Sequence, residues 1–427
     1  LMTIDKNKIF FILMSLYPLS IIAGPLISLI NTLSIIFIYM LFFFRENHYK
    51  FLIKNESLKI LFGIYVYLIF NSLFSINYEI GFSRNVGFLR LILLFIAINY
   101  FFYISKTNLK IFYTWTLVFF VFVFDVYFER FSGANVFGWG PQEIDGVFQP
   151  YGSRVMSFFK DEPIAGSYLY GFIFLVSGYV LQFFKNKTKG NFLSLFLILC
   201  FLLSVIATGE RANSIKVTFG IVLLVLIIDI IKPKTKILIL TILIVSIILL
   251  ITNSNYLKNR YVGQFYYYLS EKDSKAIEKS LYYKLYRSGF NVFKNSPLFG
   301  VGNKNYRIEA CGDVKKVIEF NYKCTTHPHQ TYIELLSEHG LIGAFILLVS
   351  FFLLMFKNLK KIIFSKNYIQ IGSFVYLLSV FLPLLPSGSF FSDFNITFFF
   401  INLSFLYAVN QNTNIFFVEK NFKNSNF

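Results

Sequence analysis

Charged residues are scarce in this chain of 427 residues: they make up 15% of it, and basic residues outnumber acidic ones by 40 to 22. The sequence has no Asp-x-Asp pair of the kind that holds a metal-bound nucleotide sugar, which argues against an enzyme that uses sugar nucleotides. Its 3 Cys lack the spacing of a zinc site. The first apolar segment follows Lys6 and Lys8 without a small-residue cleavage site, so we expect no cleavable signal peptide.

Hydrophobic residues are abundant instead. They make up 56% of the chain, with 57 Phe, and the mean hydropathy is +0.62. Apolar runs of roughly 18–22 residues recur from end to end, and each is long enough to cross a hydrocarbon core of ~30 Å. The sequence therefore predicts an all-α polytopic membrane protein of about 12 transmembrane helices.

Short connectors rich in lysine predict the orientation, because such loops stay on the cytoplasmic side of a membrane. Successive connectors between spans alternate between the two sides of the membrane. With this alternation, every lysine-rich connector and both chain termini are predicted to lie in the cytoplasm. The connectors are Arg45–Lys59, Lys106–Lys110, Lys185–Lys189, Lys232–Lys236 and Lys357–Lys366. The formal net charge of +18 then reflects lysine facing anionic membrane lipids, and no nucleic-acid partner is needed to explain it.

The longest external segment divides the chain into three parts. We expect an N-terminal membrane bundle of about nine spans over residues 1–250 and a C-terminal bundle of about three spans, with a short cytoplasmic tail, over residues 331–427. Residues 251–330 form a large external loop between the ninth and tenth spans.

Part of this external loop has the pattern of an amphipathic helix. Helical spacing over Ser280–Phe293 puts Leu281, Leu285 and Val292 on one face. We expect this helix to lie on the membrane surface, and to be weakened or bent at Gly289.

Two cysteines fall in the same external loop, Cys311 and Cys324, whereas Cys200 lies within a predicted span. An oxidising external compartment favours a disulfide between the first two, which would close a short loop just before the histidines described next. Metal binding by the two cysteines is the alternative, without a recognisable zinc spacing in its favour.

The stretch Thr326–Leu348 combines histidines with the start of a membrane helix. His327-Pro328-His329 ends the polar loop, and an apolar face then recurs at helical spacing in Tyr332, Leu335, Leu336 and Ile342. The first turn of a helix presents free N–H groups that favour anions and disfavour a charged imidazole. A neutral histidine beside a phosphate site could serve as a base; surface histidines in a helix-entry turn are the plainer alternative.

One arginine lies in a tight external hairpin. Arg211 falls in the connector Ala207–Lys216, which is too short to reach far from the bilayer. Arginine at this depth is costly unless it is paired or functional, and Glu210 could be its structural partner. Because the hairpin needs no charge for its topology, the pattern favours a functional role.

Other arginines lie at the external ends of predicted spans. Arg154 precedes Asp161 and Glu162 at the start of the sixth span, either as an interface anchor or in a buried pair that shapes a cavity. Arg84 and Arg90 open the fourth span, where their side chains could snorkel to the interface or belong to a site.

These motifs together resemble the O-antigen ligase and O-antigen polymerase superfamily. The resemblance rests on the Thr-Gly-x-Arg hairpin, on a Gly-Val-Gly turn and on the histidine motif with the residues after it. These are Thr208-Gly209-Glu210-Arg211, Pro297-Leu298-Phe299-Gly300-Val301-Gly302, Asn305-Tyr306-Arg307, His327-Pro328-His329-Gln330-Thr331-Tyr332, Glu338 and Gly340. It implies a GT-C-like membrane glycosyltransferase that takes a glycan from polyprenyl diphosphate at the periplasmic face of the bacterial inner membrane, without a metal or other cofactor.

The resemblance also implies roles for individual residues. His329 would deprotonate or orient the acceptor hydroxyl, with His327 as the accompanying histidine. Arg211 would bind the donor diphosphate, and Arg307 matches an arginine that sometimes follows the Gly-Val-Gly turn. An arginine common early in the amphipathic segment is absent, with Tyr282 near its place, and Arg287 a turn away could substitute.

Four further residues have supporting roles in this hypothesis: Glu338, Gln330, Tyr332 and Arg154. Gln330 stands where the family usually has Asn, which keeps an amide on a longer side chain.

The predicted function is transfer of a glycan from a polyprenyl diphosphate donor to an acceptor sugar hydroxyl. In a ligase the acceptor is the lipid A core, and in a polymerase it is the next glycan repeat unit. A related transferase onto protein is a third possibility within the class. A lipid-glycan flippase is an alternative of another class, but the charges gather at external loops rather than along the spans.

Overall fold

The computed structural model describes residues 5–43, 55–140, 143–144, 147–148, 154–160, 162–185, 188–264, 266, 278 and 280–417. Parts of the lysine-rich connectors 45–59 and 185–189 therefore lie outside the described residues, as does Asp161. Within those ranges nearly every ordered element is a helix, and the strands form one antiparallel pair, β1 (Glu143–Ile144) with β2 (Val147–Phe148). The all-α fold class predicted from composition is confirmed.

Eight helical segments of the described chain are long and apolar enough to cross a membrane. They are built on α3 (Pro25–Phe43), α5 (Glu56–Asn71), α6 (Tyr78–Gly87) with α7 (Leu89–Ile104), α8 (Ile111–Ser132), α9 (Ala165–Phe183), α10 (Thr188–Ala207), α12 (Pro233–Thr252), and α19 (Thr331–Phe356) with α20 (Leu359–Phe364).

Four further apolar segments are shorter. They are α1 (Lys6–Ser15) with α2 (Tyr17–Ile22), α11 (Arg211–Ile227), α21 (Tyr368–Val380) and α22 (Asp393–Ala408). The protein is thus a polytopic helical membrane protein, and the count of about twelve spans stays a prediction.

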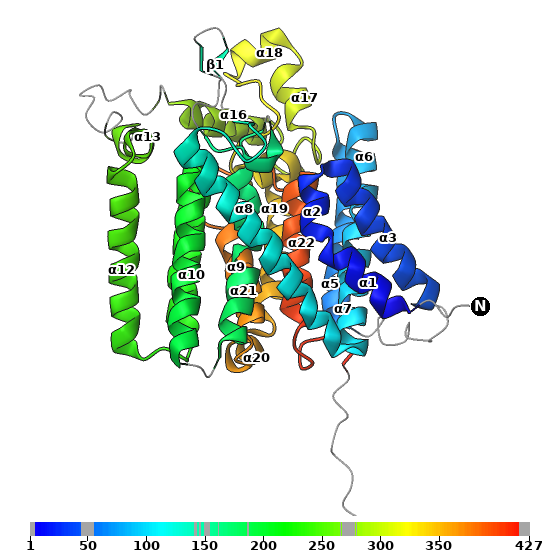
Figure 1. The fold of residues 1–427 in the computed structure, drawn as a ribbon. Coiled ribbons are helices and arrows are strands. Elements are labelled where there is room, and N and C mark those ends of the chain that lie inside the picture. The colour runs from blue at the N-terminus through cyan, green and yellow to red at the C-terminus, as the bar shows by residue number, and fades with distance from the viewer. Residues whose placement is uncertain are drawn as a thin grey trace, which may run out of the picture.

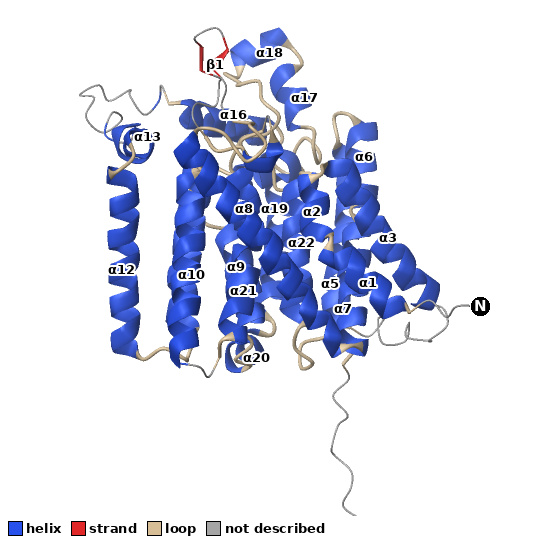
Figure 2. Cartoon of the chain, viewed as in Figure 1, coloured by secondary structure: helices blue, strands red, loops and turns tan. Residues whose placement is uncertain are grey.

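The long helices stand side by side, with α12 at one edge of the bundle and α3 at the other (Figure 1; Figure 2). Smaller helices cover one end: α13 (Asn255–Lys258), α16 (Leu281–Asn295), α17 (Tyr306–Cys311) and α18 (Val314–Glu319). We call this end of the bundle the cap end. The predicted external loop 251–330 contributes all four of these helices.

The centre of the bundle is formed by α9, α21 and α22, where small residues let helix backbones approach closely. A Cβ atom on Gly372 of α21 would lie 2.1 Å from the carbonyl oxygen of Phe174, and one on Gly178 of α9 would lie 2.3 Å from that of Tyr368. Glycine at both contacts allows tight van der Waals packing, which drives helix association where water is absent. The outermost helix, α12, buries only 6% of its span.

The helix α19 is interrupted at Gly340, and the Gly-Val-Gly turn packs against this break. Gly340 has φ +66°, which interrupts the helix and frees backbone groups. Leu341 N then donates to Pro297 O at 2.8 Å, and Gly302 N donates to Glu338 O at 2.9 Å. Because the turn docks against the broken helix, the single buried face predicted through Ile342 is wrong: Ile342 is exposed.

The amphipathic helix α16 packs on α19 through its predicted apolar face. Gly289 allows this contact, since a Cβ there would lie 2.5 Å from Ile333 Cγ2 and 2.6 Å from Pro328 Cβ. The helix runs unbroken through Gly289, so the predicted weakening or bend is not observed. Leu285 and Val292 are buried within the protein, so the expectation that this face lies on the membrane surface is wrong for these two residues, and Leu281 is exposed at the helix start.

A disulfide joins Cys311, at the end of α17, to Cys324 in the segment that leads to the histidines, and Cys200 is free. In membranes kept under air, we expect alkylation of Cys311 and Cys324 only after reduction, while labelling of Cys200 does not depend on the reductant. Complete labelling of Cys311 without reductant would contradict the pairing. Replacing both cysteines should lower the free energy of unfolding of this segment by about 2–4 kcal/mol.

Candidate active site

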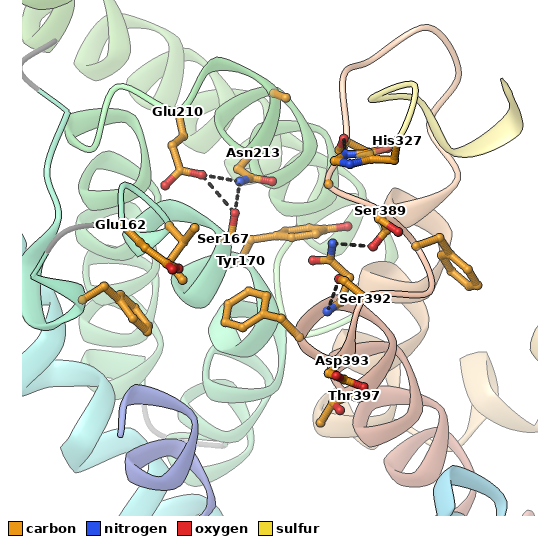
Figure 3. A pocket seen from close by; sticks show the side chains of 18 of the residues that line it. Glu162, Ser167, Tyr170, Glu210, Asn213, His327, Ser389, Ser392, Asp393 and Thr397 are labelled. Atoms are coloured by element: carbon orange, nitrogen blue, oxygen red, sulfur yellow. Dashed lines mark hydrogen bonds between the residues drawn. The ribbon is translucent and has the colours of Figure 1, made fainter. Parts of the chain in front are cut away.

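A cavity of about 1740 Å³ lies among the helix ends beneath α16 (Figure 3). Figure 3 shows Ser167, Glu210 and Asn213 on one side of it and His327, Ser389, Ser392 and Asp393 on the other. We call these sides the arginine wall and the histidine wall, because Arg211 and its neighbours line the first and the histidines line the second. The lining comes from residues far apart in the sequence, from Ile21 to Thr397.

The two histidines of the motif lie ring against ring on the histidine wall, with centroids 4.0 Å apart. His327 is held at both ring nitrogens, by Thr326 Oγ1 at 3.0 Å and by Ser387 O at 3.3 Å. His329 is held through its backbone, since its carbonyl accepts from Ser387 N at 2.9 Å. Among the described residues none hydrogen bonds to a ring nitrogen of His329, so this imidazole is available to a substrate.

The backbone at His329 is strained, with φ +57°, a region that non-glycine residues seldom occupy and that clusters at functional sites. Lys304, across the same wall, has φ +60°. Two neighbouring segments fix these conformations. One is the docked Gly-Val-Gly turn, and the other is the segment 381–392, which Tyr332 anchors by donating to Phe381 O at 2.6 Å.

Burial lowers the pKa of both histidines. The pKa of His327 falls from 6.5 to about 4, mainly through burial, with a smaller effect of the Lys304 charge. The pKa of His329 also falls to about 4, through burial and then the neighbouring His327, although Glu334 acts in the opposite direction. Both rings are therefore neutral near pH 7, the state in which an imidazole accepts a proton.

These lowered pKa values predict that the rate of the catalysed reaction falls only at an unusually low pH. A base is lost when it is protonated, and here protonation sets in only as the pH falls towards about 4. We expect the rate to stay on its plateau through pH 6.5 and to fall below about pH 5. The rate measured from pH 4 to 8 with purified protein tests this, and a midpoint near 6.5 would contradict it.

The arginine wall gathers three guanidinium groups: Arg154, Arg211 at the start of α11, and Arg260 in the π-helix η4 (Asn259–Gly263). Burial lowers the pKa of Arg260, and the charges of Arg154 and Arg211 lower it further. Among the described residues no carboxylate lies within 4.0 Å of any of them. Such a concentration of unpaired positive charge is a site for an anion.

Glu210, the candidate structural partner of Arg211, forms no ion pair within 4.0 Å with the three arginines, although the Arg154 charge acts on its carboxyl. Its carboxylate accepts from Gly166 N at 2.6 Å, Ser167 Oγ at 3.0 Å and Asn213 Nδ2 at 2.6 Å. Burial raises the pKa of this carboxyl, and the hydrogen bonds partly offset that effect. Glu210 therefore ties the hairpin to α9 and leaves Arg211 free to face the cavity.

The hairpin itself is tighter than predicted. α10 ends at Ala207 and α11 begins at Arg211, so only three residues connect them and Lys216 lies within α11. Gly209 makes the turn with φ +80°, and its carbonyl accepts from Arg260 Nε at 3.2 Å. The conformation of the hairpin thus positions both arginines.

Arg154 makes no ion pair with Glu162 within 4.0 Å, so the predicted buried pair is not formed there; Asp161 lies outside the described residues. The Nε atom of Arg154 is buried without a hydrogen-bond partner in the described part of the chain. Arg154 nevertheless belongs to the cavity, as a member of the arginine wall.

The two other arginines of the predicted diphosphate site lie outside the cavity. Arg287 is exposed on α16, because the opposite face of that helix, with Leu285, Ser288 and Val292, packs inward. Arg307 is exposed on α17, because its neighbour Tyr306 is the buried residue of that turn. The structure therefore does not bring these two arginines to the cavity, and their part in binding a diphosphate stays a prediction.

Three predicted supporting residues make hydrogen bonds that stabilise the segments of the histidine wall. Gln330 caps α19, its Oε1 accepting from Ile333 N at 2.8 Å. Glu338 is buried and its Oε1 accepts from Tyr306 N at 3.4 Å, while its Oε2 has no hydrogen-bond partner in the described part of the chain. Tyr332, as noted above, anchors the segment that carries Ser387.

Sequence reasoning missed Arg260 and Lys304. Lys304 lines the cavity, and its Nζ donates to Ser389 Oγ at 2.6 Å, which in turn donates to the buried Glu334 at 2.6 Å. The only sequence signal for Lys304 was its position two residues after the Gly-Val-Gly turn. Arg260 had no motif or period to mark it.

The fold and cavity define the class of protein: a polytopic membrane protein with a cationic cavity and neutral histidines. Residues 195–348 match a family described as O-Antigen ligase. The match supports the resemblance to the O-antigen ligase superfamily over these residues. The matched segment includes Arg211, Arg260, Lys304 and both cavity histidines. No curated protein sequence matches the chain.

Proposed function

We propose that the protein transfers a glycan from a polyprenyl diphosphate to a sugar hydroxyl of the acceptor, and that the lipid A core is that acceptor. The observation that carries this proposal is the pairing of two features in one cavity. Three arginines, with no carboxylate within 4.0 Å among the described residues, line the same cavity as a neutral histidine whose ring has no hydrogen bond within the described part of the chain. An anionic leaving group and a hydroxyl that must lose a proton require these two features.

The arginine wall binds the donor diphosphate in this proposal. Arg211, Arg154 and Arg260 offer planar forks that can each take two phosphate oxygens and that keep their charge. The diphosphate gains negative charge as its bond to the anomeric carbon breaks, so arginines fixed before the reaction stabilise the transition state more than the ground state.

The histidine wall activates the acceptor. The acceptor oxygen attacks the anomeric carbon while its proton passes to the neutral imidazole of His329. The carbon–oxygen bond to the diphosphate breaks, and polyprenyl diphosphate leaves with both electrons of that bond. His327, held at both nitrogens by Thr326 and Ser387, positions the ring beside it. The proposal needs no metal ion, so activity should survive a chelator.

We place the cavity on the periplasmic side of the inner membrane and both termini in the cytoplasm. The support is that described parts of the lysine-rich connectors lie at the opposite end of the bundle from the cap end; Lys234, for example, lies in the first turn of α12, whose other end leads to α13.

Reporter fusions test this orientation. A fusion at Asn303, in the cap end, should report the periplasm, and a fusion at Lys234 should report the cytoplasm. A cytoplasmic signal from Asn303 would overturn the orientation and with it the choice of donor.

Deleting the gene and separating the surface polysaccharide on a gel tests the proposed function. Loss of all long chains on lipid A, with polymer accumulating on the carrier lipid, is the result expected for a ligase. A single repeat unit attached to lipid A would instead identify a polymerase, which performs the same chemistry on a different acceptor. An unchanged polysaccharide would contradict both.

A further inference from the structure

The cavity carries a second charged cluster, which neither the arginine wall nor the histidines use. Arg84 on α6 donates through Nη1 to Oδ2 of Asp393, the first residue of α22, at 2.9 Å. Arg90 on α7 donates through Nη2 to Oδ1 of the same carboxylate. All three side chains line the cavity, and those of Arg84 and Asp393 are 46% and 47% exposed.

The charges of this cluster do not balance. Two guanidinium groups meet one carboxylate, and among the described residues no second carboxylate lies within 4.0 Å of Arg84 or Arg90. Each oxygen of Asp393 engages a different arginine, and Arg90 Nη1 also donates to Gly87 O at 3.1 Å. Each guanidinium has five N–H donors, so both arginines keep N–H groups for a second anion, and Arg84 keeps more of them. A phosphate suits this arrangement, because arginine forks bind phosphate and carboxylate in the same bidentate manner.

The position of the cluster tells which substrate it would meet. Asp393 follows the segment that carries Ser387, which holds both histidines, and Ser389, which contacts Lys304. Figure 3 shows Asp393 on the same side of the cavity as His327 and Ser389, opposite Glu210 and Asn213. With the donor diphosphate on the arginine wall, a ligand held by Arg84 and Arg90 is on the acceptor's side.

This part of the cavity also reaches the lipid-facing edge of the bundle. Residues of α2 and of the start of α3 line it, including Leu26 and Leu29, which are 67% and 36% exposed. An apolar edge beside a positive cluster is complementary to a lipid that bears a phosphate.

We propose that Arg84 and Arg90 bind a phosphate group of a membrane-borne acceptor, and that Asp393 holds the two forks in position for it. The proposal rests on the function proposed above, because it assigns the substrate that this wall receives. The acceptor class it defines is a glycolipid with a phosphate close to its membrane anchor.

Substitutions that change the charge of the cluster distinguish phosphate binding from a purely structural role, in which the ion pairs only hold α6, α7 and α22 together. Arg84→Gln and Arg90→Gln each remove a positive charge, whereas Asp393→Asn removes the negative one and keeps the shape. Phosphate binding predicts shifts of opposite sign, and a structural tie predicts that all three variants are impaired alike. Lys357→Gln is the matched control, because it breaks the Lys357–Glu56 pair at 2.8 Å between other helices.

The measurement is native mass spectrometry of the purified full chain with phosphatidic acid and with phosphatidylcholine as probes. We expect wild type to prefer phosphatidic acid, Arg84→Gln and Arg90→Gln to lose about tenfold of that preference, and Asp393→Asn to increase it. Lys357→Gln should match wild type. Equal binding by all variants, or equal losses accompanied by a lower melting temperature, would overturn the proposal.

Two further experiments are needed. The first distinguishes a lipid phosphate from free phosphate, and the second distinguishes failure of this proposal from failure of the proposed function. Inorganic phosphate should not displace phosphatidic acid at equal concentration, and displacement would refute a membrane-borne ligand. In the transfer assay, Arg84→Gln should raise the acceptor KM about tenfold and leave the donor KM unchanged. If wild type transfers nothing, the proposed function fails, while the lipid-binding result still decides whether the cluster holds a phosphate.

Discussion

Replacing His329 with Ala or Asn should reduce glycan transfer about 10²–10⁴-fold, the contribution of one general base, and leave donor binding within about twofold of wild type. The ring has no hydrogen bond among the described residues, so its replacement removes the base and the ring contact with His327 but breaks no hydrogen bond. Asn tolerates the left-handed backbone of this position better than Ala does, which separates loss of the base from backbone strain. Transfer and donor binding are measured on the same purified, reconstituted protein.

His327 provides the internal comparison. Its nitrogens are committed to Thr326 and Ser387, so His327→Ala should disturb the position of the neighbouring ring and lower the rate less than loss of His329. Full activity in His329→Asn would refute the assignment of the base. Equal losses at the two histidines together with inactivation of wild type by a chelator would point to a metal site instead.

Replacing Arg211 with Ala should weaken donor binding about 10–100-fold, since a hydrogen bond to a charged group contributes roughly 1.5–3 kcal/mol. Arg211→Lys should recover only part of the affinity, because lysine keeps the charge and loses the bidentate fork. Arg260→Ala should act in the same direction, as a second member of the arginine wall. The measurement is the Kd for polyprenyl diphosphate in detergent or nanodiscs.

Two exposed arginines supply a matched control for this experiment. Arg287→Ala and Arg307→Ala remove the same side chain from positions outside the cavity. We expect both to bind the donor like wild type. Weakened binding in Arg307→Ala with normal binding in Arg260→Ala would contradict the donor site described here.

Residues that belong to a local motif were the easiest to place from sequence. Arg211 and the two histidines each lie in a short contiguous sequence motif, and all three line the cavity. Arg287 and Arg307 lie outside the cavity, which the sequence could not indicate because a motif gives the order of residues and not the direction of each side chain. One step along α17 separates the buried Tyr306 from the exposed Arg307.

The rest of the site depends on contacts that no local pattern records. Arg260 lies in a π-helical turn and Lys304 has a left-handed backbone, so neither has a helical period to reveal which way it points. Arg84 and Arg90 looked like interface anchors because their partner, Asp393, lies 309 and 303 positions further along the chain. The spans were predictable because hydropathy is a local property.

The central claim is tested most directly by one reconstituted reaction. Purified protein in liposomes is given a glycan on polyprenyl diphosphate and an acceptor glycolipid, and mass spectrometry quantifies both products in the same sample. The account predicts free polyprenyl diphosphate and glycosylated acceptor in equal amounts, with a chelator present. Glycan that crosses the bilayer still attached to its carrier, with no free polyprenyl diphosphate, would contradict it and identify a transporter.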